Sequence, residues 1–243
     1  MGFINKFNPK THKQVYSFFT PEECTRISKI LLRDEPMVLD IPNNEPSEYY
    51  TGTTNQFNVY NWLDNPDMIQ FDIPKRLFTL PEFRQEKVLY VQCWANILRQ
   101  GQNIPYHQHG NPKTNDGIEF YASNTFISGP ETTGTYYNDA YERNSQGIMH
   151  LIGSYVTHGV HTHMSHTPRI SMAMDIYHSQ SKVIKNAERY HTEEEQFYAS
   201  NTFISGPTTT GTYYNDAYER NEIGQMQLLG SQVTHGVRTH MSH

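Results

Sequence analysis

The chain is poor in cysteine and in basic residues, and each shortage excludes a class of protein. Two cysteines among 243 residues, Cys24 and Cys93, form no disulfide framework and no CxxC motif, which fits a reducing cytosol. The net charge of −6 argues against duplex nucleic acid as the main partner, because neutralising phosphates requires a basic surface. No stretch approaches the ~18 consecutive apolar residues of a membrane span. The first residues lack the apolar segment of a signal peptide, so we expect a cytoplasmic protein.

The N-terminal part predicts a helix that covers a β domain. Thr20, Pro21 and Glu23 form an N-cap, a first-turn proline and a capping-box glutamate. Apolar residues then recur on one helical face, at Cys24, Ile27, Ile30 and Leu31. The composition from Asp34 to Asn65 favours loop and edge strand. We therefore assign residues 1–86 to a helical and loop cover.

After Glu86 the apolar pattern alternates with a period of two, which is typical of strands. The candidate strands are Val88–Leu98, Ile104–His109, Phe120–Ser128, Thr133–Tyr137, Ile148–Ile152, Ser154–His161 and Arg169–His178. Short strands with helices only in front of them favour a mainly β fold, a sandwich or jelly roll, over a parallel α/β sheet. Residues 87–178 are the predicted core domain.

A close internal copy follows this domain. Residues 197–243 repeat residues 120–166 without a gap and with eight differences in 47 positions. The copy has His235 where the first segment has His158, and it ends before any counterpart of Arg169. Such similarity indicates a partial duplication, not an ancient repeat fold. Residues 179–196 are polar and charged, and we interpret them as a linker.

Three histidines of the predicted core domain have the spacing of a metal site. His107 and His109 are two positions apart, so in a strand both side chains point to one face. His158 supplies a third nitrogen from an apolar strand, whereas His161, His163 and His166 occupy a polar turn. Three ligands on one side of a metal leave other coordination positions open.

On the last strand, four residues share one face and begin with a pair suited to a carboxylate. They are Arg169, Ser171, Ala173 and Asp175. An arginine beside a hydroxyl group holds a carboxylate by charge-assisted hydrogen bonds. Arg169 could form a salt bridge at the start of the strand, but an arginine that points inward needs a partner, since an unpaired buried charge is costly.

The order and spacing of these motifs resemble the Fe(II)/2-oxoglutarate-dependent dioxygenases, especially the prolyl hydroxylase-like branch and related phage-encoded oxygenases. Gly101 lies six residues before His107, and His158 lies eleven residues before Arg169. Arg169 and Ser171 form an Arg-x-Ser motif. The opening FFTPEECTRI also looks like the first helix of that family. The resemblance covers about Phe18 to His178.

The resemblance implies a double-stranded β-helix that binds Fe(II) and takes 2-oxoglutarate as cosubstrate. The implied metal ligands are His107, His109 and His158. The implied cosubstrate residues are Arg169, Ser171 and Asn96. The sequence departs from the family at His109, where an Asp or Glu is usual, and a site of nitrogen ligands alone also suits zinc, nickel or copper. A carboxylate could instead come from Asp116, Glu119 or Asp139.

The leading hypothesis is thus an iron- and 2-oxoglutarate-dependent hydroxylase, located in the host cytoplasm if phage-encoded. Its substrate is a small molecule or a protein side chain, and the sequence selects neither. One alternative is a cupin-like three-histidine metalloprotein that does not use 2-oxoglutarate. Another is a non-enzymatic β-sandwich assembly protein with a degenerate site, forming a homo-oligomer through the C-terminal copy.

Overall fold

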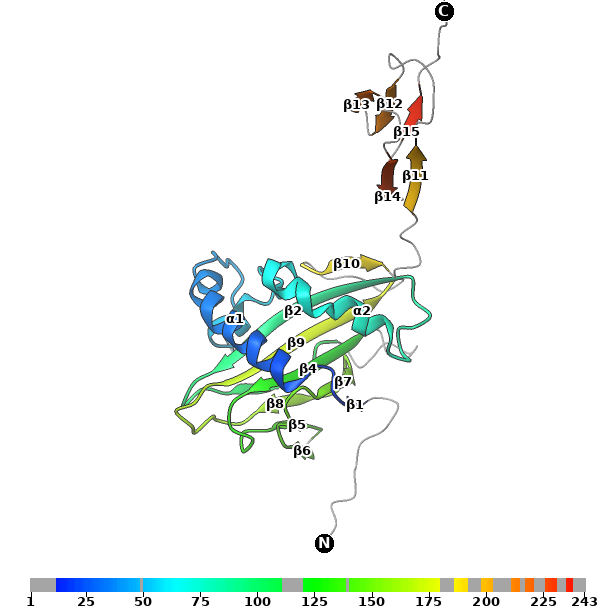
Figure 1. The fold of residues 1–243 in the computed structure, drawn as a ribbon. Coiled ribbons are helices and arrows are strands. Elements are labelled where there is room, and N and C mark those ends of the chain that lie inside the picture. Colours follow the sequence, from blue (N-terminus) through cyan, green and yellow to red (C-terminus); the bar gives the residue numbers. More distant parts are fainter. Residues whose placement is uncertain are drawn as a thin grey trace, which may run out of the picture. The chain divides into compact units, whose positions relative to one another are not determined.

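The fold was obtained as a computed structural model (Figure 1). It describes residues 12–48, 50–110, 120–138, 140–179 and 186–191, together with five strand segments between 198 and 237. The chain divides into two compact units, Met1–Tyr190 and His191–His243, and each is considered by itself.

Two antiparallel sheets form the first unit. The larger sheet has the order β1 (His12–Val15), β7 (Met149–Gly153), β4 (Tyr121–Ser128), β9 (Arg169–His178), β2 (Val88–Leu98) and β10 (Glu188–His191). The smaller sheet has the order β3 (Ile104–His107), β8 (His158–Val160), β5 (Thr135–Tyr137) and β6 (Ala140–Glu142). The mainly β architecture with few helices confirms the predicted fold class.

Helices cover one side of the larger sheet, and the smaller sheet lies on its other side (Figure 1). The helical elements are α1 (Pro21–Leu39), α2 (Ile73–Phe78), η1 (Gly52–Gln56), η2 (Trp62–Asp64) and η3 (Pro66–Phe71). Both hydrogen bonds of the predicted capping box are present between Thr20 and Glu23. Such a cap contributes about 1 kcal/mol to helix stability.

The helix continues further than the composition predicts. We expected loop and edge strand from Asp34 onward, which is wrong for the first residues, because α1 runs through Pro36 to Leu39. Buried Val38 and the ion pair between Glu35 and Arg99 attach this last turn to the core. The later residues of that stretch form 3₁₀ turns, and none of those that the structure describes belongs to a strand.

Strands β2 and β9 have the bounds that the alternation predicts, and they pair along their whole length. On β9, alternate apolar side chains pack into the core that includes α1; they are Ile170, Met172, Met174 and Ile176. The opposite face of β9, which carries Ala173 and Asp175, borders a cavity between the two sheets. This alternation places the site on the inner face of the larger sheet.

Part of the predicted linker is a strand, because β10 joins the edge of the larger sheet beside β2 and its Tyr190 packs against the core. In the described residues, no helix is both long and apolar enough to cross a bilayer.

The copy reproduces the strand pairing of the segment that it repeats. Its strands are β11 (Tyr198–Thr202), β12 (Gly211–Tyr214), β13 (Ala217–Arg220), β14 (Met226–Gly230) and β15 (His235–Val237). The pairing of Tyr214 with His235 corresponds to that of Tyr137 with His158. Within its described strands the copy has no partner equivalent to β1, β3 or β9, so it forms a two-stranded and a three-stranded sheet.

Candidate metal centre

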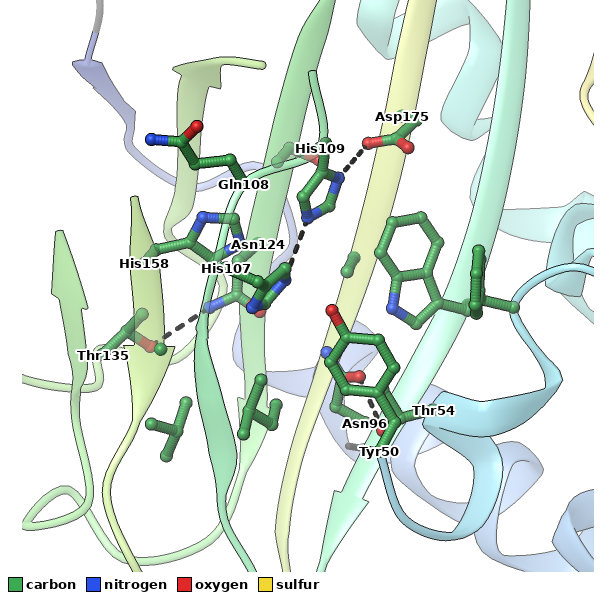
Figure 2. Close-up of a pocket in the computed structure, with 17 residues that line it drawn as sticks. Tyr50, Thr54, Asn96, His107, Gln108, His109, Asn124, Thr135, His158 and Asp175 are labelled. Carbon is green, nitrogen blue, oxygen red and sulfur yellow. Dashed lines mark hydrogen bonds and ion pairs between the residues drawn. The ribbon is translucent and has the colours of Figure 1, made fainter. Parts of the chain in front are cut away.

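Three histidines from two strands and a loop meet at one end of the cavity (Figure 2). His107 ends β3, His158 begins β8, and the two residues are opposite each other in the antiparallel pair. His109 follows β3, where its backbone N–H donates to the carbonyl of Ser154. One ring nitrogen from each histidine lies within 4.8 Å of the others, a spacing that could hold a metal ion.

Gly101, six residues before His107, occupies a position that favours glycine. Gly101 adopts a φ of +85° in the turn between β2 and β3, a conformation that side chains rarely allow. Its N–H donates to the carbonyl of His163, which ties the turn to the segment after β8. The turn thus places β3 beside β8.

Each of the three imidazoles is anchored through Nδ1 by an oxygen acceptor. The distances are 2.8 Å from His107 to Pro105 O, 2.9 Å from His158 to Val156 O, and 2.5 Å from His109 to Asp175 Oδ1. A carbonyl or carboxylate only accepts hydrogen bonds, so each Nδ1 carries a proton and Nε2 is the ring nitrogen left to bind a metal. The Nε2 atoms of His107 and His109 are 3.2 Å apart. Two ring nitrogens this close need a cation between them, either a proton or a metal ion, and the cluster can hold a metal ion.

Burial keeps two of these histidines, His107 and His158, in the neutral form that binds metals. Burial, followed by the charge of His109, lowers the pKa of His107 to about 4. Burial likewise places the pKa of His158 well below its usual value, and the two neighbouring histidines lower it further. Neutral imidazole is the ligand form, so protons do not compete for the nitrogens of His107 and His158 near pH 7.

The cavity beside the histidines has a volume of about 230 Å³ and mixed walls. Apolar and aromatic residues line one part, namely Tyr50, Phe57, Trp94, Ile104 and Val160. The polar residues include Thr54, Asn96, Asn124 and Thr135, in addition to the histidines and Asp175 (Figure 2). Burial raises the pKa of Tyr50 to about 12, so its phenol stays protonated and can donate a hydrogen bond.

Asn96, predicted as a cosubstrate residue, lines this cavity. It accepts a hydrogen bond of 2.9 Å from the hydroxyl of Thr54 through Oδ1. Its own N–H groups are therefore the part of the side chain that could meet a bound molecule.

Arg169 and Ser171, also predicted to bind the cosubstrate, do not border the cavity. Arg169 is fully buried, and its guanidinium donates to Thr133 O, Thr135 Oγ1, Ser171 Oγ and Asn144 Oδ1. All four acceptors are neutral, and among the described residues no carboxylate contacts this arginine. Burial lowers its pKa to about 10, which leaves it charged at pH 7. Thr135 lies between this charge and the cavity. Its hydroxyl accepts from the guanidinium at 2.9 Å, and the residue lines the cavity.

The structure also places the other candidates. His161 stacks on Tyr136, and His163 bonds with Thr133 and the carbonyl of Thr167, so neither belongs to the cluster. Asp116, Glu119 and Asp139, considered as carboxylate ligands, lie outside the described residues. The sequence reading did not select Tyr50, Thr135 or Asp175 as site residues. The only signal was for Asp175, which shares the alternating face of Arg169.

The fold and the site define a jelly-roll protein with three histidines arranged to hold a metal ion. No family model matches the sequence, and no curated protein matches it. Among solved structures, a prolyl-4-hydroxylase of Pseudomonas putida is similar at 10% identity and a TM-score of 0.51, over 70% of this chain and 93% of that one. EctD from S. alaskensis in its apoform has 10% identity and a TM-score of 0.51, over 76% and 82% of the two chains.

A third similar structure is HygX from Streptomyces hygroscopicus with nickel, 2-oxoglutarate and hygromycin B bound. It has 11% identity and a TM-score of 0.50, over 73% of this chain and 86% of that one. All three proteins are Fe(II)/2-oxoglutarate-dependent oxygenases. At these identities the similarity establishes a shared fold, and it confirms the resemblance at the level of that superfamily's fold.

Proposed function

We propose that the protein is an Fe(II)- and 2-oxoglutarate-dependent dioxygenase that hydroxylates its substrate. The observation that carries the proposal is the convergence of one ring nitrogen from each of three histidines whose Nδ1 atoms already have hydrogen-bond partners. His107, His109 and His158 would hold the metal. When bound, Fe(II) and 2-oxoglutarate supply the activation of O2 that protein side chains lack.

The remaining cavity residues would bind and orient the cosubstrate and the substrate. The buried charge of Arg169 favours an anion at the cavity wall formed by Thr135, since an unpaired buried charge is costly. Asn96 offers N–H donors to the cavity from β2 of the larger sheet, and Tyr50 offers a phenol. The aromatic lining would exclude water from the reacting groups. The substrate class, a small molecule or a protein side chain, stays open.

One observation favours a second function, a three-histidine metalloprotein that does not use 2-oxoglutarate. Arg169 lies behind the cavity wall, and protein oxygens already accept from three of its nitrogens. A site of three neutral imidazoles also requires no dicarboxylate to be complete. In this case Arg169 would only hold β5 against β9.

Anaerobic reconstitution with Fe(II) and 2-oxoglutarate separates the two functions. The dioxygenase proposal expects a visible charge-transfer band that appears only when both are present. The band should be lost in His107→Ala and kept in the control His161→Ala, which alters a histidine outside the cluster. Wild-type protein that binds Fe(II) but gives no band and no heat on titration with 2-oxoglutarate would establish the second function instead.

A further inference from the structure

Asp175 is a buried acid that accepts a hydrogen bond from one candidate ligand, His109. The residue is 4% exposed, on the inner face of β9. Its Oδ1 accepts from His109 Nδ1 at 2.5 Å, and among the described residues no lysine or arginine contacts it. Burying a carboxylate costs several kcal/mol without a charged partner. A metal ion in the histidine cluster, or a second proton on His109, would supply that charge.

The anchoring of the three histidines is asymmetric. Backbone carbonyls hold His107 and His158, whereas a carboxylate holds His109. A carboxylate partner increases the electron donation of an imidazole, because it draws the Nδ1 proton toward itself. His109 is also the position at which the sequence departs from the Asp or Glu usual in the family it resembles. Position 109 thus has a histidine in place of a carboxylate ligand, and a carboxylate, Asp175, bonds to the far nitrogen of that histidine.

We propose that Asp175 is a positioning residue that fixes His109 for metal binding and supplies the negative charge that the ligand set lacks. The inference rests on the metal site of the proposed function and is independent of 2-oxoglutarate. Three neutral imidazoles leave a divalent ion with its full charge, and the buried Asp175 carboxylate offsets part of it across one ring. The same hydrogen bond fixes the orientation of the His109 ring, with Nδ1 toward Asp175 and Nε2 toward the cluster.

Two variants separate the two roles. Asp175→Asn keeps an oxygen that accepts from Nδ1 but removes the charge, whereas Asp175→Ala removes both. Binding of Co(II), measured by calorimetry and by its visible spectrum, should weaken by about 10-fold in the first variant and up to about 100-fold in the second. Glu35→Gln is the matched control, because Glu35 is a buried acid whose partner is Arg99 and not a histidine of the cluster. Its Co(II) affinity should equal that of the wild type.

A change at His109 provides a readout that a loss of stability would not give. His109→Asp replaces the imidazole with a carboxylate, so the ligand carries its own charge and no ring remains for Asp175 to orient. In this background Asp175→Asn should weaken Co(II) binding far less than the roughly 10-fold expected in the wild-type background. A merely structural role for Asp175 would give an equal loss in both backgrounds.

Each outcome decides the matter. A loss of Co(II) affinity that is large in the wild-type background and small in His109→Asp supports the proposal. An equal loss in both backgrounds, or none in either, overturns it while the metal site stands. Wild-type protein that binds Co(II) but not 2-oxoglutarate removes the dioxygenase proposal and leaves this one intact. Wild-type protein that binds no Co(II) overturns both.

Discussion

His107 and His158 lie opposite each other on neighbouring antiparallel strands, and their ring centroids are 4.4 Å apart. The pairing of β3 with β8 therefore builds the candidate metal site. A ligand pair that depends on strand register is rigid, because a slip by one residue would turn one of the side chains away. Residues close in sequence to these two need not share their role.

We expect His158→Ala to weaken Co(II) binding by more than about 100-fold, a larger loss than for a residue that only orients a ligand. Removing one of three nitrogens leaves two ligands and exposes the ion to water. The matched control is His161→Ala, three positions along the same segment, which should bind Co(II) like the wild type. Calorimetric titration measures both, and equal losses in the two variants would show that the site lies elsewhere.

The buried arginine should distinguish metal binding from cosubstrate binding. Arg169→Lys keeps a positive charge but cannot bond simultaneously to Thr133, Thr135 and Ser171, so unsatisfied acceptors should destabilise the fold by about 2 kcal/mol. Folded Arg169→Lys should bind Co(II) normally and bind 2-oxoglutarate at least about 10-fold more weakly. Chemical denaturation gives the stability, and titrations give the two affinities. Unchanged 2-oxoglutarate affinity would contradict a role in anion binding.

Two buried histidines outside the cluster, His12 and His150, should make the free energy of unfolding depend on pH. His12 Nε2 and His150 Nδ1 are 2.9 Å apart, and burial lowers their pKa values to about 4 and about 3. The unfolded chain binds protons below about pH 6.5 that the folded chain does not, so stability falls as pH decreases from about 6.5 toward 4. One imidazole with a pKa of about 4 contributes a loss of about 2 kcal/mol between pH 7 and pH 5.

The copy provides a natural substitution for testing this effect, since it has Gln227 where the first segment has His150. His150→Gln should reduce the pH dependence of the free energy of unfolding, measured with chelator present so that metal binding does not contribute. His166→Gln, which alters a histidine of an exposed turn, should leave the slope unchanged. A slope as steep in His150→Gln as in the wild type would exclude the pair as its source.

The period-two pattern of apolar residues predicted the strands that carry the site. It did not predict how far behind the cavity wall a side chain lies. Strands β2 and β9 were predictable because their apolar residues recur with a period of two along their length, and His158 was identified by its apolar strand and its distance from Arg169. The pattern also put Arg169 on the inner face, but it could not show that Thr135, from another strand, lies between its guanidinium and the cavity. Long-range contacts of this kind depend on sheet packing, which local sequence does not encode.

Asp175 and Tyr50 illustrate the same limit. Asp175 meets His109 across the two sheets, and only the fold brings them together. Tyr50 comes from a segment rich in polar residues without a periodic pattern, and its place in the cavity follows from how that segment packs against the sheet. The predicted ligands belong to recognisable local motifs, whereas Tyr50 belongs to none and Asp175 shares only the alternating face of β9.

The last prediction concerns His235, the counterpart of His158 in the copy. In the first unit β8 pairs with both β5 and β3, and β3 carries His107. In the described part of the copy, β15 pairs with β12 alone, so no second strand brings further histidines to His235. His235→Ala should therefore bind Co(II) like the wild type, and His158→Ala/His235→Ala should be no weaker than His158→Ala. Metal binding by His158→Ala that disappears only in the double variant would instead show that the copy replaces residues 120–166 in the fold, with His235 as the third ligand.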